Sequence, residues 1–173
     1  MVFDPADAPK DRKHFMEWYR RTTEWSEGHD YNDPSSTTPQ LRAWYEDIRK
    51  LYRNMNGAGA PTDEDLMKPG IEDRLADYSS AQHAIYATFP WSEAENVYPI
   101  VRELAVKHKV GFYDVSGDEG DGEIYFPGDE LRPSADGAWR QISADFQSGD
   151  LSKYIPQELA PKRSWFDIFR RNK

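Results

Sequence analysis

The sequence of 173 residues contains no cysteine, and this absence excludes disulfide bonds, thiolate zinc sites and a cysteine nucleophile. No apolar run approaches the roughly 20 residues that a membrane-spanning helix requires. The first residues also lack the basic region and the apolar stretch of a signal peptide. We therefore expect a cytoplasmic protein.

Positive charge is also scarce. The chain has 22 lysine and arginine residues against 31 aspartate and glutamate residues, a formal net charge of -9. Such a protein repels nucleic acid phosphates and anionic lipid surfaces and attracts a basic protein, so we expect neither nucleic acid nor a membrane as a partner. The charge is uneven, because residues 111–137 carry eight carboxylates against one arginine and residues 162–173 carry five basic residues against one aspartate.

Aromatic residues are abundant, with 6 Trp, 10 Tyr and 8 Phe, and they predict a core rich in aromatic side chains. Apolar residues three and four positions apart predict amphipathic helices over residues 9–25 and from Pro39 to Gly57. A third helix is expected to begin at Ser92, because Ser92 and Glu95 have the spacing of a capping box.

Three stretches have the composition of β-strands. Residues 76–89 are rich in aromatic and β-branched side chains and predict either one strand or a strand that continues from a preceding one through Ser79 and Ser80. Residues 110–115 and 123–126 flank an acidic, glycine-rich turn, which is the pattern of a hairpin. A long connection over residues 54–74 and a short helix over residues 139–146 complete the predicted elements.

The order of helix pair, strand, helix, hairpin and helix predicts an α+β fold, with a mainly antiparallel sheet covered by helices. The length is that of one domain of ordinary size. We expect a single α+β domain over residues 1–160, followed by a basic-aromatic tail over residues 161–173.

Side chains with catalytic or metal-binding chemistry gather at one place, where His29, Asp30 and Asp33 lie close in sequence. A histidine beside carboxylates can bind a metal or act as an acid–base group. The same residue types also cap turns and helix ends through local hydrogen bonds, and the sequence leaves both interpretations open. It contains no nucleotide-binding motif and no serine-nucleophile motif.

A calcium loop is a weaker match. Asp114, Ser116 and Asp118 fall at alternate positions, as the first three ligands of such a loop do. The sixth position of the template holds Glu119 in place of glycine, and the twelfth holds Tyr125 in place of glutamate. We therefore expect a solvated hairpin turn here, and the sequence as a whole predicts no metal site and no cofactor.

Four short phrases carry a resemblance to a family, and they lie at residues 15–19 (FMEWY), 23–29 (TEWSEGH), 31–34 (YNDP) and 111–116 (GFYDVS). Together they resemble small acidic bacterial proteins associated with secreted toxins. This family comprises the cognate immunity proteins of interbacterial systems, of the type VI or polymorphic kind. The similarity covers about two thirds of the chain, from Phe3 to about Tyr125.

The resemblance implies a function by binding and not by turnover. A protein of this type is a toxin inhibitor that covers the active site of its cognate toxin, a protein that we expect to be basic and to be bound one to one. Interfaces favour aromatic side chains, and carboxylates speed the encounter with a basic partner. On this basis the candidate toxin-binding residues are Glu27, His29 and Tyr31 after the first helix, and Asp118, Glu119 and Asp121 in the hairpin turn.

Two other functions stay open at this point. One is a small metal-dependent enzyme that uses His29, Asp30 and Asp33. The other is a cytoplasmic adaptor whose partner is not a toxin. We expect no enzyme activity, because the quoted phrases contain no catalytic signature.

The start of the chain departs from the family. Proteins of this type usually have an extra apolar stretch before the Phe-Asp-Pro sequence found here at residues 3–5. The chain begins almost at this point. We therefore expect a shortened first strand that leaves a sheet edge, and the sequence does not predict how this edge pairs.

Overall fold

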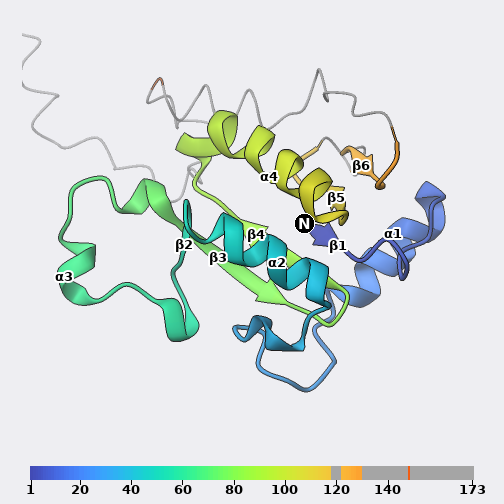
Figure 1. The fold of residues 1–173 in the computed structure, drawn as a ribbon, viewed down its shortest axis with the longest axis horizontal. Coiled ribbons are helices and arrows are strands. Elements are labelled where there is room, and N and C mark those ends of the chain that lie inside the picture. The colour runs from blue at the N-terminus through green and yellow to red at the C-terminus, as the bar shows by residue number, and fades with distance from the viewer. Residues whose placement is uncertain (118–121, 130–147, 149–173) are drawn as a thin grey trace, which may run out of the picture.

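A computed structural model of the chain describes residues 1–117, 122–129 and 148 (Figure 1). The helices and strands in chain order are β1 (Val2–Phe3), α1 (Arg12–Thr22), α2 (Pro39–Ile48), β2 (Arg53–Asn54), α3 (Asp63–Leu66), β3 (Leu75–Ser80), β4 (Ala84–Thr88), α4 (Ala94–His108), β5 (Gly111–Tyr113) and β6 (Ile124–Tyr125). Single 3₁₀ turns lie at Pro34–Ser36, Gly57–Gly59, Glu72–Arg74 and Trp91–Glu93.

The strands form a six-stranded sheet in the order β2-β3-β4-β1-β5-β6. Strand β2 pairs with β3 in parallel, and the other neighbours are antiparallel. The prediction of an α+β fold with a mainly antiparallel sheet is therefore confirmed. In the part of the chain described here, no helix is both long and apolar enough to cross a membrane.

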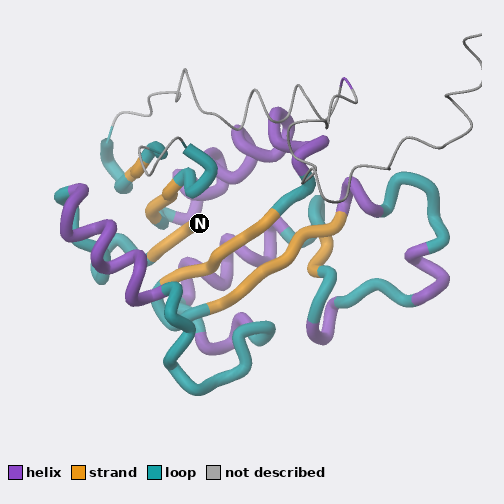
Figure 2. The backbone as a smooth tube through the Cα atoms, turned by 180° about the vertical axis from the view of Figure 1, so that it is seen from behind, coloured by secondary structure: helices purple, strands orange, loops and turns teal. Residues whose placement is uncertain are grey.

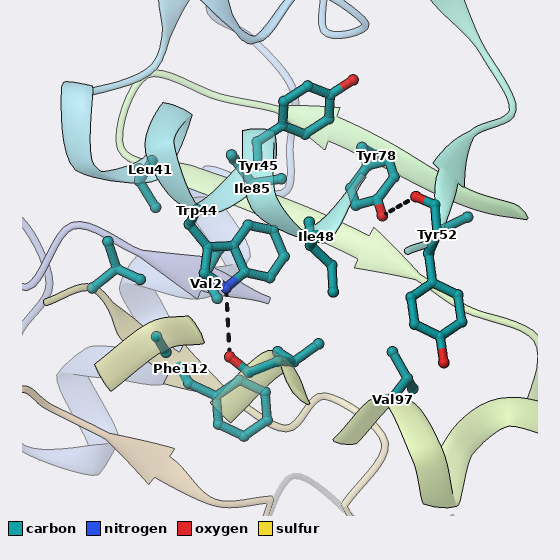
Figure 3. Close-up of a cluster of buried hydrophobic side chains, with 14 of the residues drawn as sticks. Val2, Leu41, Trp44, Tyr45, Ile48, Tyr52, Tyr78, Ile85, Val97 and Phe112 are labelled. Carbon is teal, nitrogen blue, oxygen red and sulfur yellow. Dashed lines mark hydrogen bonds between the residues drawn. The ribbon is translucent and has the colours of Figure 1, made fainter. Parts of the chain in front are cut away.

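Helices α2 and α4 cover one face of the sheet (Figures 1 and 3). The apolar side chains of α2 recur every three or four residues, so that Leu41, Trp44 and Ile48 are fully buried on one side of the helix. The indole of Trp44 donates to the carbonyl of Val101 on α4 at 3.4 Å, and the hydroxyl of Tyr78 donates to the carbonyl of Tyr52 at 2.7 Å. These bonds satisfy polar atoms that the core would otherwise leave without partners.

Helix α1 covers the opposite face, at the end of the sheet formed by β1 and β5 (Figure 2). Its Phe15 and Trp18 pack against Phe3 with ring centroids 5.1 and 5.6 Å apart. Clusters rich in aromatic side chains therefore pack on both faces of the sheet, as the abundance of Trp, Tyr and Phe predicts.

Strand β1 lies inside the sheet, between β4 and β5, where a sheet edge was expected. It is short, as predicted. Gly111 of β5 is opposite Phe3, and a Cβ at Gly111 would lie 2.1 Å from the nearest atom of the Phe3 ring. Only glycine allows this approach.

The first two predicted helices are present but shorter than expected. The first begins at Arg12 behind the N-cap Asp11, and Trp25 lies beyond it with a φ of 51°. The second ends at Ile48, well before Gly57. The expected capping box of Ser92 was wrong, because α4 begins at Ala94 and Ser92 donates instead to Asp73 at 2.7 Å.

The region from residue 54 to residue 89 also differs from the prediction. The long connection contains helix α3, whose Thr62 and Asp65 form a capping box. The expected strand over residues 76–89 is a hairpin of two strands, β3 and β4. The second hairpin is present as β5 and β6, although each strand is shorter than expected. The predicted helix over residues 139–146 and the tail over residues 161–173 lie outside the described residues.

Candidate partner-binding site

The loop between α1 and α2 carries three of the six predicted binding residues, and the structure brings them together. The loop turns sharply because Trp25 and Gly28 adopt positive φ angles of 51° and 76°. It then returns along the β3–β4 hairpin, where the Ser80 amide donates to the carbonyl of Tyr31 at 2.8 Å. Its position is therefore fixed by the sheet.

Glu27, His29 and Tyr31 hold this loop in place. The Glu27 carboxylate accepts from the amide of Gln82 at 2.8 Å, and the amide of Glu27 donates to the Tyr31 hydroxyl at 2.6 Å. Nε2 of His29 lies 2.9 Å from the carbonyl of Ser80. Since a carbonyl only accepts, Nε2–H of His29 is the donor in this contact, and Nδ1 lies 3.5 Å from the Glu27 carboxylate.

Aromatic packing strengthens the same loop. The ring of Tyr31 lies 5.1 Å from the ring of Trp25 and 4.5 Å from that of His29. Trp25 also contacts Tyr86 of β4, with ring centroids 6.4 Å apart. The loop therefore presents its exposed side chains from a packed and hydrogen-bonded base.

The other two residues of the possible metal site have structural roles. Asp30 accepts from the amide of Asn32 at 2.9 Å, and Asp33 accepts from the amide and hydroxyl of Ser35 at 2.8 and 2.7 Å. The bonds from Ser35 lower the pKa of Asp33. Among the described residues, no group of three or more His, Asp or Glu side chains is arranged to hold a metal ion.

The second predicted binding group, Asp118, Glu119 and Asp121, lies outside the described residues. The base of its hairpin is well defined, because the Asp114 amide donates to the carbonyl of Glu123 at 2.9 Å. The Asp114 side chain is buried and accepts from the amide of Ser116 at 3.0 Å. Glu123 is bonded to Tyr98 and Arg102, which attaches the hairpin to α4.

Two surface features had no counterpart in the sequence analysis. A cavity of about 480 Å³ lies between α4, β4 and the chain that follows β5. The connection around α3 exposes Leu66 and Met67, with 49% and 84% of their surface accessible. Single exposed apolar side chains are common on protein surfaces and by themselves indicate no contact surface. In the sequence, the only indication of the exposed surface around α3 was the unusual length of the connection over residues 54–74.

In comparisons with known proteins, no family model, no curated protein and no solved structure matches this chain.

Proposed function

We propose that this protein is an immunity protein, which binds a cognate secreted bacterial toxin and neutralises it by covering the toxin's active site. Its partner is a basic protein bound one to one. The immunity protein itself acts in the cytoplasm, uses no cofactor and turns over no substrate. The resemblance of four sequence phrases to this class of proteins, from interbacterial type VI or polymorphic systems, supports the proposal.

The observation that carries the proposal is the fixed acidic loop between α1 and α2. No lysine or arginine occurs between Arg21 and Arg42, while four carboxylates do, on Glu24, Glu27, Asp30 and Asp33. The Glu27 carboxylate accepts from the Gln82 amide and His29 contacts the Ser80 carbonyl, which holds the loop on the β3–β4 hairpin, while the bond from the Glu27 amide to the Tyr31 hydroxyl braces the loop internally. A binding loop held in one conformation loses little conformational entropy when it meets a partner.

The test is co-expression with the product of the adjacent gene. We expect a one-to-one complex on size-exclusion chromatography and survival of cells that express both proteins. Cells that express the neighbouring protein alone are expected to die. If the two proteins do not associate and survival does not depend on this chain, the proposal fails and an adaptor for another partner becomes the better interpretation.

The interface is tested separately from the function. Alanine at Asp118, Glu119 and Asp121 removes three carboxylates from the hairpin turn, and the expected result is slower association with the toxin. If the affinity and the association rate both stay unchanged, the hairpin is not part of the interface. The same test at Glu27, His29 and Tyr31 needs a folding control by NMR, because these side chains also hold the loop.

The metal-dependent enzyme makes a different prediction. A site on His29, Asp30 and Asp33 requires stoichiometric metal in the purified protein, and His29→Ala would remove it. We expect elemental analysis to find less than about 0.1 metal ion per chain, with no change in melting temperature on chelation. A full equivalent of metal that His29→Ala abolishes would support the enzyme.

A further inference from the structure

One face of the β3–β4 hairpin carries a strip of side chains that no helix of the described chain covers (Figure 2). Cross-strand partners share a face of a sheet, and the register pairs Asp77 with Thr88 and Ser79 with Tyr86. Tyr86 packs with the aromatic cluster around α1, whereas the next residue, Ala87, packs with α2 and α4. The four paired side chains therefore lie on the α1 side of the sheet. All four are partly or fully exposed, and we call them the open strip.

The two ends of the open strip are held in position by neighbouring segments. At one end, the ring of Trp25 lies 6.4 Å from that of Tyr86 and 5.1 Å from that of Tyr31, which places two half-exposed rings of the α1–α2 loop beside the sheet. At the other end, Asn56 donates to one carboxylate oxygen of Asp77 at 2.6 Å. The rings and the carboxylate are therefore oriented before a partner arrives.

The surroundings of the open strip lack positive charge. Residues 75–101, which include the whole hairpin, contain no lysine or arginine, and neither do residues 22–41 of the neighbouring loop. Arg53 of the adjacent strand β2 is engaged elsewhere, because its guanidinium donates to Asp65 at 2.7 Å and to two backbone carbonyls. Among the described residues, no cation pairs with Asp77. The strip therefore repels phosphate groups and attracts a cationic side chain.

The side chains of the strip suit one kind of cation in particular. Tyr86 and Asp77 are diagonal neighbours across the two strands, a separation of about 7–8 Å that long side chains bridge. A guanidinium above the Tyr86 ring gains a cation–π contact and can also donate to the Asp77 carboxylate. The hydroxyls of Ser79 and Thr88 are further acceptors on the same face. The planar guanidinium, with five donors, fits this set better than an ammonium group.

The composition of this surface differs from that of a solvated sheet face. An antiparallel sheet can leave one face to water, and the side chains on such a face are polar. Here a tyrosine in the strip is bordered by half-exposed rings of Trp25 and Tyr31. Trp and Tyr are enriched at the energetic centres of protein interfaces, and the surrounding rings exclude water from a charged contact.

We propose that the open strip binds an arginine side chain of the cognate toxin, with the guanidinium over Tyr86 and bonded to Asp77. This inference rests on the proposed function, because the toxin supplies the arginine. It extends the interface from the α1–α2 loop onto the β3–β4 hairpin.

The affinity of the full chain for the toxin tests the role of the carboxylate. Asp77→Asn keeps the size of the side chain and an oxygen that accepts from Asn56, but it removes the charge. We expect it to weaken toxin binding by about tenfold or more. Glu103→Gln is the matched control, because it makes the same charge change at an exposed position on α4, on the opposite face of the sheet, and should change the affinity by less than about twofold. Equal affinities of the two variants would overturn the proposal.

Two substitutions at Tyr86 test the role of the ring. Tyr86→Phe retains an aromatic face and should bind the toxin within about threefold of the unsubstituted chain, whereas Tyr86→Leu should bind about tenfold more weakly. Since Tyr86 also contacts Trp25, the NMR spectrum of each variant is compared with that of the unsubstituted chain. A folded Tyr86→Leu variant with unchanged affinity would show that no cation lies on this ring.

A probe without the toxin separates this inference from the proposed function. The probe is the peptide acetyl-Gly-Arg-Gly-amide, and the control replaces arginine by citrulline, which has the same shape without the charge. We expect amide NMR shifts at residues 77, 79 and 86 with the arginine peptide alone. These shifts in a chain that does not associate with the toxin would support the arginine site and contradict the immunity function. No shift with the arginine peptide would overturn the arginine site, whether or not the toxin binds.

The chain itself contains a competing ligand, because the tail over residues 161–173 includes Arg163, Arg170 and Arg171. A full-length variant with glutamine at these three positions should leave the amide shifts of the open strip unchanged in the protein without toxin. Changed shifts in the strip would show that the tail of this chain occupies it, and they would overturn its assignment to the toxin.

Discussion

Asp47 shows how one partly buried carboxylate joins two helices of this fold. It lies near the end of α2 and is 22% exposed. Its carboxylate accepts hydrogen bonds from Lys107 and His108 of α4, at 2.7 and 2.9 Å, and from Lys50 at 2.7 Å. The bonds from Lys107, Lys50 and His108, in that order of effect, lower the pKa of Asp47. The charged form is therefore favoured by folding.

Asp47→Asn is expected to lower the melting temperature at pH 7 by a few degrees. A carboxyl whose pKa is lower in the folded than in the unfolded protein stabilises the fold above the unfolded pKa, of about 3.9. This contribution is lost as the pH falls toward the folded pKa. Thermal unfolding between pH 7 and pH 2 should therefore show a deficit that is constant above about pH 5 and shrinks as the pH falls below the unfolded pKa.

The control for this pH dependence is Glu46→Gln. Glu46 is 46% exposed and pairs with Arg49 on its own helix, so its removal breaks no contact between helices. Exposed pairs of this kind contribute little. An Asp47→Asn deficit that stays constant down to pH 2, or that equals the Glu46→Gln deficit at pH 7, would contradict the role assigned to Asp47.

Two glycines are required for different reasons, Gly111 for close packing between strands and Gly28 for its backbone conformation. Gly111→Ala would place a methyl group 2.1 Å from the Phe3 ring, inside the aromatic cluster below α1. We expect it to lower the free energy of unfolding by about 3 kcal/mol, because a packed cluster cannot absorb an extra group. Chemical denaturation followed by tryptophan fluorescence measures this loss.

Gly28→Ala adds the same methyl group where no atom lies within 4 Å. Its cost is limited to backbone strain at a φ of 76°, about 1 kcal/mol. The comparison separates steric from conformational effects. If Gly111→Ala were no more destabilising than Gly28→Ala, β1 would not be packed against β5 as described.

The fold class and the helices were predictable because they depend on local patterns. Leu41, Trp44 and Ile48 repeat at helical spacing and are buried on one side of α2. The ends of the helices depend on tertiary contacts. Ser92 has the spacing of a cap, yet Asp73 competes for its hydroxyl from a distant part of the chain, and α4 begins at Ala94 instead.

The pairing of the strands was harder to predict from the sequence. The two residues of β1 carry no periodic signal, and their place between β4 and β5 follows from contacts more than 80 residues away in the chain. The candidate loop was identified from its residue types. The way in which Glu27 and His29 hold this loop in place could not be predicted, because their hydrogen-bond partners are backbone groups of residues 80 and 82. The cavity had no sequence signal, since its lining comes from β1, α2, β4, α4 and β5, which are far apart in the chain.

At the scale of the whole molecule, the net charge of -9 and the acidic loop would make separate contributions to an encounter with the proposed basic toxin. Net charge acts at long range and is screened beyond about 10 Å at 0.1 M salt. A fixed cluster of carboxylates acts at shorter range and orients the approach. Complex formation with the proposed toxin should therefore be fast and should slow as the salt concentration rises.

Charge reversal tests which contribution dominates. The double variant Glu24→Lys and Asp30→Lys changes the net charge from -9 to -5, because each substitution adds two positive units. We expect association at low salt to slow by about tenfold, with a smaller effect on dissociation. Stopped-flow fluorescence at two or more salt concentrations measures the rate.

The matched double variant is Glu64→Lys and Glu103→Lys, which makes the same change in net charge at exposed positions on α3 and α4. It reduces the long-range attraction but leaves the loop intact, so its association should slow by only about two- to threefold. Equal slowing by the two variants would assign the attraction to net charge alone and remove the loop from the interface. A larger effect at Glu24 and Asp30 that disappears at high salt would place the approaching toxin over the α1–α2 loop, because screening suppresses only the electrostatic part of the encounter.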